Sequence, residues 1–127
     1  MKIYRIIPAA LLLLVLAGCG KQYKAKALVS EFLEMYAVNA STSIEKITNL
    51  DSTAYINDEV IEQMRTNAKK SGLLKPEVRY GNRPVHSKTL LFTTVTYSIT
   101  GNNNERKEYR QTFYLNPELT EVVAVKE

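Results

Sequence analysis

The sequence lacks several residues on which common functional sites depend. It has one cysteine, one histidine, two aspartates and no tryptophan among 127 residues. A single cysteine excludes an intramolecular disulfide, so the hydrophobic core must hold the domain without a covalent cross-link. One histidine excludes the His-rich ligand sets of many zinc sites. Glycine-rich phosphate loops, Gly-x-Ser-x-Gly elbows and Cys-x-x-Cys pairs are also missing. The sequence therefore predicts no catalytic residue, no metal and no cofactor.

The remaining acid–base candidates have ordinary explanations. His86 lies in Arg-Pro-Val-His-Ser, a setting typical of a loop or the start of a strand. Asp51 lies in Leu-Asp-Ser-Thr, where its side chain can cap the following turn. Asp58 falls in the first turn of a predicted helix, where a carboxylate interacts favourably with the helix dipole. Acid–base catalysis would require burial or close pairing to shift their pKa values, so we expect structural or solvent-facing roles.

The N-terminal residues have the layout of a secretory signal peptide. Lys2 and Arg5 form a short positive region, and residues 6–16 are an apolar run interrupted only by Pro8. The small residues Ala17 and Gly18 follow, as expected before a cleavage site. The alternative is a transmembrane anchor, but crossing a bilayer takes about 20 apolar residues. The run is too short for that, which favours the signal peptide.

The single cysteine comes directly after this run. Leu16-Ala17-Gly18-Cys19 resembles the lipobox of bacterial lipoproteins. The resemblance implies a diacylglyceryl group on the Cys19 thiol, cleavage before Cys19 and acylation of the new amine. One acyl chain anchors only marginally, whereas two or three give a stable attachment. A buried or catalytic thiol is the alternative, but the chain offers no second cysteine. We expect residues 1–18 to be a cleaved signal peptide and Cys19 to be the lipidation site.

The mature chain would be a single domain on a very short tether. Removing residues 1–18 leaves 109 residues, with 15 basic and 13 acidic side chains. This length suits one domain, and the small net charge gives no basic stripe for nucleic acid. We expect residues 19–23 to form a lipid-anchored tether and residues 24–127 to form one domain. The predicted partners are the membrane, through the lipid, and an envelope protein or a small ligand.

The residues beside the predicted anchor bear on its location. Lys21, Lys24 and Lys26 either attract anionic head groups, by about 1 kcal/mol each, or are ordinary solvated lysines. No acidic residue follows Cys19 before Glu31. By analogy with bacterial lipoproteins, we expect the cell envelope: the periplasmic face of the outer membrane in a cell that has one, and otherwise the outer face of the plasma membrane.

Two helices are predicted in the first part of the mature chain. Apolar residues at spacings of three and four from Ala25 to Tyr36 predict a helix that ends near Val38-Asn39. Residues 42–56 fit either a short helical turn or a strand over 45–53. The second helix follows Asn57, a good N-cap, and Gly72 ends it.

The rest of the chain alternates with the period of a strand. Val78 and Tyr80, between two prolines, predict a short interrupted edge strand. Residues 88–100, 105–115 and 121–125 predict three further strands joined by turns at 101–104 and 116–118. Helices first and strands last predict an α+β fold. We expect the helices to pack on one face of a curved antiparallel sheet of three to four strands.

This order of elements resembles the cystatin-like and NTF2-like α+β rolls, in which a curved sheet wraps around a long N-terminal helix. The segments KAKALVSEFLEMY, ITNLDS and VTYSITGNNNERKEYRQTFYLNPELTEV are similar to a group of small envelope lipoproteins. The resemblance covers most of residues 24–125 and includes no chemically distinctive motif. It implies a fold and an anchored location, and it implies no activity.

Aromatic residues provide the last candidate site. Rolls of this class can hold a pocket between helix and sheet, and Tyr36, Tyr97, Tyr109 and Phe113 are possible lining residues; alternatively they fill the core with hydroxyls at its rim. We predict a membrane-anchored lipoprotein with a non-catalytic domain that binds a ligand or partner. The alternatives are a small NTF2-like enzyme and an immunity or inhibitor-type lipoprotein.

Overall fold

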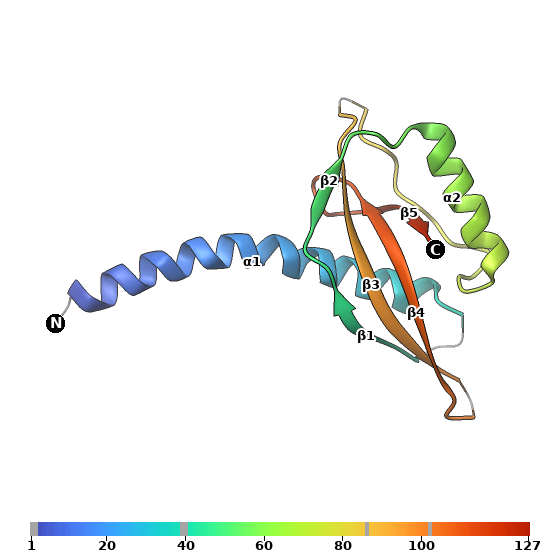
Figure 1. The fold of residues 1–127 in the computed structure, drawn as a ribbon, viewed down its shortest axis with the longest axis horizontal. Coiled ribbons are helices and arrows are strands. Elements are labelled where there is room, and N and C mark those ends of the chain that lie inside the picture. The colour runs from blue at the N-terminus through green and yellow to red at the C-terminus, as the bar shows by residue number, and fades with distance from the viewer. Residues whose placement is uncertain (1–2, 39–40, 86, 102) are drawn as a thin grey trace.

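The computed structural model describes the backbone of residues 3–38, 41–85, 87–101 and 103–127, and within these ranges the side chains from Gly20 onward. Figure 1 shows a long helix crossing a twisted antiparallel sheet, with a second, shorter helix beside the last strand. The helices are α1 (Ile3–Tyr36) and α2 (Asp58–Ser71). The strands are β1 (Ser41–Ile47), β2 (Asp51–Thr53), β3 (Leu90–Thr100), β4 (Arg106–Leu115) and β5 (Val122–Lys126). The predicted α+β class is confirmed.

Helix α1 is longer than the sequence pattern predicted. It is continuous through residues 19–23, the segment expected as a tether, and it ends at Tyr36 rather than near Val38-Asn39. Its end is fixed by the chain that follows α2: Lys75 N donates to Tyr36 O at 2.7 Å, and Val38 N donates to Leu73 O at 3.0 Å. These pairings replace the next helical turn. Asn39 lies outside the described residues.

Helix α2 forms where its capping signals predict it. The Asn57 side chain accepts a hydrogen bond from Val60 N at 2.9 Å, and Gly72 ends the helix with a φ of 73°. Glycine adopts this left-handed conformation without a steric penalty, because it has no Cβ, and Gly72 can therefore end the helix here. Ile61, Met64 and Ala68 form the buried face.

The sheet has five strands, so the expectation of three to four was too low. Its order is β1-β3-β4-β5, and β2 pairs with β3 beside β1. The extra strands come from residues 42–56, where the strand alternative is correct and the helical turn is wrong. The loop 48–50 divides this stretch into β1 and β2, and β1 carries a bulge between Ile44 and Lys46.

The predicted edge strand around Val78 and Tyr80 is absent from described residues 75–85. This segment touches β5 through Gly81, whose N donates to Val122 O at 2.8 Å. Val78 and Tyr80 are instead half-buried against the α1 core. The alternating apolar residues of this segment therefore pack on the core without forming a strand, because the segment makes no ladder of backbone hydrogen bonds.

The two helices lie on opposite faces of the sheet, which corrects the expectation of one shared face. Odd-numbered residues of β3 and β4 (Val95, Tyr97, Phe113 and Leu115) pack with α1 in one buried cluster. Even-numbered Leu90 and Tyr114 pack with Ile61 and Met64 of α2 in a second cluster. Because successive strand residues point to opposite faces, the sheet separates the two clusters. The C-terminal end of α2 reaches the first cluster through Ala68.

Candidate binding surfaces

The first turns of the predicted mature chain are fixed to the sheet by one side chain. Gln22 Nε2 donates to Thr48 O at 2.9 Å, and Gln22 Oε1 accepts from Leu50 N at 2.9 Å. Both ends of the amide are thus used on the loop 48–50 between β1 and β2. Cys19 lies three residues earlier in the same helix; its side chain is outside those described. We name the Gln22 contacts with Thr48 and Leu50 the Gln22 clamp.

The loop that Gln22 holds is itself tied to the central strand. Thr48 N donates to Thr94 O at 2.9 Å, and Thr94 N donates to Thr48 Oγ1 at 2.8 Å. Thr93 Oγ1 donates to Thr48 O at 2.7 Å. Thr93 is fully buried. Thr48 is exposed, and its hydrogen bonds with the Gln22 clamp join α1, the loop and β3 at this corner.

The four aromatic residues proposed to line a pocket are divided between core and surface. Tyr97 and Phe113 are fully buried. The Tyr97 hydroxyl donates to Gln111 Oε1 at 2.6 Å. Burial, followed by the neighbouring Tyr109 and the Glu127 carboxylate, raises the pKa of Tyr97. Tyr109 packs its ring 5.9 Å from that of Tyr97. The Tyr97 side chain is a core group with a satisfied hydroxyl.

Tyr36 and Tyr109 each line a different groove. Tyr36 contributes to a groove of about 270 Å³ between α1 and the residues around Gly81, whose lining also includes Phe32, Met35, Arg79, Tyr80 and Glu121. Tyr109 lines another groove of about 270 Å³, with Leu73, Ile99 and Lys107, beside the β3–β4 turn. The four aromatic residues therefore do not share one of these grooves.

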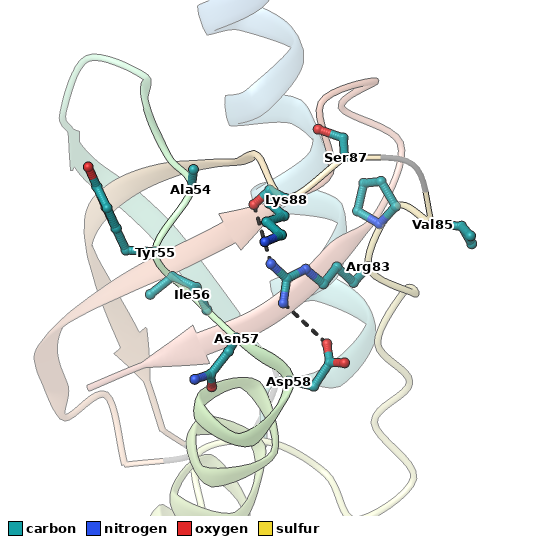
Figure 2. Close-up of a pocket in the computed structure, with 10 residues that line it drawn as sticks. Ala54, Tyr55, Ile56, Asn57, Asp58, Arg83, Val85, Ser87 and Lys88 are labelled. Carbon is teal, nitrogen blue, oxygen red and sulfur yellow. Dashed lines mark hydrogen bonds and ion pairs between the residues drawn. The ribbon is translucent and has the colours of Figure 1, made fainter.

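An open hollow lies at the N-terminal end of α2, as Figure 2 shows. Its volume is about 620 Å³. Tyr55 and Val85, each 92% exposed, stand at opposite rims (Figure 2). Between them the Arg83 guanidinium pairs with Asp58 at 3.2 Å and donates to Lys88 O at 3.4 Å. We call this surface the α2 hollow; it is lined by Ala54, Tyr55, Ile56, Asn57, Asp58, Arg83, Pro84, Val85, Ser87 and Lys88.

The two aspartates considered for acid–base chemistry are both exposed. Asp51, on β2, accepts a hydrogen bond from Ser52 N at 2.8 Å. Asp58 pairs with Arg83 across the α2 hollow. His86 lies outside the described residues. Within the described side chains, no three His, Cys, Asp or Glu residues come together as a metal site would need.

A second side chain that joins distant elements, Arg65 of α2, was not predicted from the sequence. We call Gln22 and Arg65 the two fixed points of the domain. Arg65 Nε donates to Val123 O at 3.0 Å, and a terminal guanidinium nitrogen donates to Gly81 O at 3.0 Å. The guanidinium also lies 5.0 Å from the centre of the Tyr80 ring. Burial raises the pKa of Tyr80, and the Arg65 charge opposes part of that rise. Arg65 therefore joins α2 to β5 and to the irregular segment that holds Gly81.

Neither fixed point has a local signature in the sequence. Gln22 bonds to residues 26 and 28 positions away, and Arg65 bonds to a carbonyl 58 positions away. A glutamine just before the predicted helix and an arginine on a charged helix are common on solvent-facing surfaces. Only the three-dimensional arrangement distinguishes them from their neighbours.

Comparison with known proteins gives no relative for this chain. No family model matches the sequence, and no curated protein or solved structure is significantly similar to it. In the part of the chain that the structure describes, no helix is long and apolar enough to cross a membrane.

Proposed function

We propose that this chain is a lipid-anchored envelope lipoprotein whose α+β domain binds a partner near the membrane and has no catalytic role. The observation that carries the proposal is Leu16-Ala17-Gly18-Cys19 after a positive and apolar N-terminal segment. The described domain adds support, because Gln22 binds the sheet only three residues after Cys19. An anchor at Cys19 would keep the domain next to the bilayer.

We propose a cystatin-like or NTF2-like roll as the finer fold. Its support is the position of α1, whose buried residues Val29, Phe32 and Leu33 pack on one face of the antiparallel sheet. A long N-terminal helix held by the sheet is the arrangement that this class of roll has.

We propose that the partner is an envelope protein and that it contacts the α2 hollow. Tyr55 and Val85 are the most exposed large hydrophobic side chains among those described. Tyrosine and arginine are enriched where proteins meet, because they combine apolar area with hydrogen-bonding groups. Tyr55 and Arg83 lie on the same surface (Figure 2). An open surface with a charged centre and apolar rims suits a protein better than a small ligand.

The anchor is tested by replacing Cys19. Cys19→Ser should release the protein from the membrane fraction and abolish incorporation of a labelled fatty acid, while the wild type keeps both. A Cys19→Ser protein that still pellets with membranes and carries label would overturn the lipoprotein assignment.

The partner is tested by capture from envelope extract with the anchored protein. The wild type should retain a stoichiometric protein, and Tyr55→Ser combined with Val85→Ser should lose it. Glu34→Ser, an exposed change on α1, is the control and should retain the protein. Equal capture by both variants would exclude the α2 hollow as the contact surface.

A further inference from the structure

The Gln22 clamp has a geometric consequence for an anchored domain. Helix α1 is continuous from Cys19 to Gln22, and three residues of α-helix rise about 4.5 Å. The anchor position therefore lies close to the corner where α1, loop 48–50 and β3 are bonded together. A flexible linker would let the domain rotate freely on its lipid, but no such linker separates Cys19 from this corner.

We propose that the domain stands on the bilayer in one orientation, with α1 end-on and loop 48–50 beside the lipid head groups. This inference rests on the lipidation of Cys19 proposed above. Figure 1 shows that α1 projects past the sheet on the side where β1 and β2 are joined, while the β3–β4 turn lies on the far side. The bilayer would meet the first of these sides.

The charges along α1 favour the end-on orientation over one in which the helix lies flat. Lys21, Lys24 and Lys26 are exposed in the turns nearest the anchor, whereas Glu31 and Glu34 are exposed further along. A flat helix would bring the acidic residues to anionic head groups, which repel them. Of these α1 residues, the end-on orientation places only the lysines there.

An exposed aromatic side chain near Cys19 supports contact of this surface with the bilayer. Tyr23 follows Gln22 and is 75% exposed. Tyrosine side chains are favoured at the membrane–water interface because the ring is apolar and the hydroxyl is wet. Asp51 is exposed on this surface beside Lys21, so three lysines face one carboxylate there.

The orientation also decides which surfaces face away from the membrane. From Gln22 to Tyr36, α1 rises about 21 Å, so the groove at Leu73 and Tyr109 lies at the distal end. The β3–β4 turn with exposed Asn103 lies beside that groove. Asn49, in the clamped loop and also exposed, marks the proximal end.

The test measures the depth of two labels on the acylated full-length product in vesicles. Asn49→Cys and Asn103→Cys each carry a spin label, with Cys19 occupied by lipid. The vesicles contain phosphatidylcholine alone or with phosphatidylglycerol. The label at 49 should be accessible to a lipid-soluble relaxation agent and protected from a water-soluble one; the label at 103 should show the reverse. The difference should be greater with phosphatidylglycerol, because of the lysines.

Two perturbations should reduce the difference while the protein still floats with vesicles. Gln22→Ala removes the clamp and should reduce the difference in part, because buried Ala25 still holds α1 to the sheet. Insertion of Gly-Ser-Gly after Cys19 adds a flexible linker and should abolish the difference. Gln63→Ala, an exposed glutamine on α2, is the matched control and should keep the difference. The insertion keeps the test valid if Gln22→Ala also loosens the fold.

Two outcomes separate the failure of the inference from the failure of the proposed function. Equal accessibility of the labels in a vesicle-bound, acylated wild type would overturn the fixed orientation and leave the lipid anchor standing. A wild type that carries no lipid by mass and does not bind vesicles would overturn the lipid anchor itself.

Discussion

Replacing Arg65 by methionine should remove the hydrogen bonds that join α2 to β5 and to the segment around Gly81. Arg65 donates one hydrogen bond to Val123 O and one to Gly81 O, and its side chain is 26% exposed. Hydrogen bonds from a charged donor contribute about 1.5–3 kcal/mol each, and partial exposure favours the lower value. The cation–π contact with Tyr80 adds about 1 kcal/mol. We expect Arg65→Met to lower the free energy of unfolding by about 3–4 kcal/mol.

Two substitutions make this prediction specific. Arg65→Lys keeps the charge and the aliphatic stem but cannot reach both carbonyls with a planar fork, so it should lose about half as much. Arg110→Met changes an exposed arginine on β4 and should change stability by less than about 0.5 kcal/mol. Urea unfolding followed by circular dichroism measures all three. If Arg65→Met were no more destabilising than Arg110→Met, the contacts assigned to Arg65 would not support the fold.

The remaining predictions concern the core, its tyrosines and one close contact. Tyr97→Phe should lower the free energy of unfolding by about 1–3 kcal/mol, because it leaves buried Gln111 Oε1 unpaired. Tyr97→Phe combined with Gln111→Met should be close to neutral. A double-mutant cycle with no coupling between the two sites would contradict this. Burial raises the pKa of three tyrosines above 10.0, so the folded chain keeps those protons longer than the unfolded chain, and the free energy of unfolding should fall as pH rises above 10.0. A free energy of unfolding, measured by urea unfolding, that stayed constant as pH rose above 10.0 would refute it. Gly81→Ala would place a Cβ against Glu121 Cβ, closer than two carbons can approach, and should lower the free energy of unfolding in urea by about 1–3 kcal/mol. No loss would mean that the Glu121 side chain moves aside freely.

Elements whose signals are local could be predicted from the sequence. Helix α2 has its N-cap at Asn57 and its left-handed end at Gly72, and each signal acts within a few residues. The β3–β4 hairpin has long alternation and a turn that tolerates positive φ, as at Asn104 with a φ of 60°. Their bounds in the structure agree with the prediction to within a few residues.

Features that depend on distant partners could not be predicted in this way. Val78 and Tyr80 alternate like a strand, but the chain beside β5 forms an isolated hydrogen bond there and no ladder. The face of the sheet that each helix covers depends on the long-range packing of α2 against β5. The spacing of apolar residues within α2 does not specify that face. The Gln22 clamp spans more than 25 residues, so the hydrogen bonds that follow Cys19 so closely could not be predicted from the sequence. Cys19 as the lipidation site stays a prediction.

The two outer edges of the sheet bear on how many copies of this domain can lie side by side. An unpaired strand edge is a template for another chain, and confinement to a surface would multiply such encounters. At one edge β1 is interrupted by its bulge, where Glu45 forms an ion pair with Arg106 of β4. At the other, the Gly81 segment occupies Val122 O and Arg65 occupies Val123 O. We expect the bulge at one edge and the Gly81 segment at the other to disfavour strand-to-strand pairing between copies.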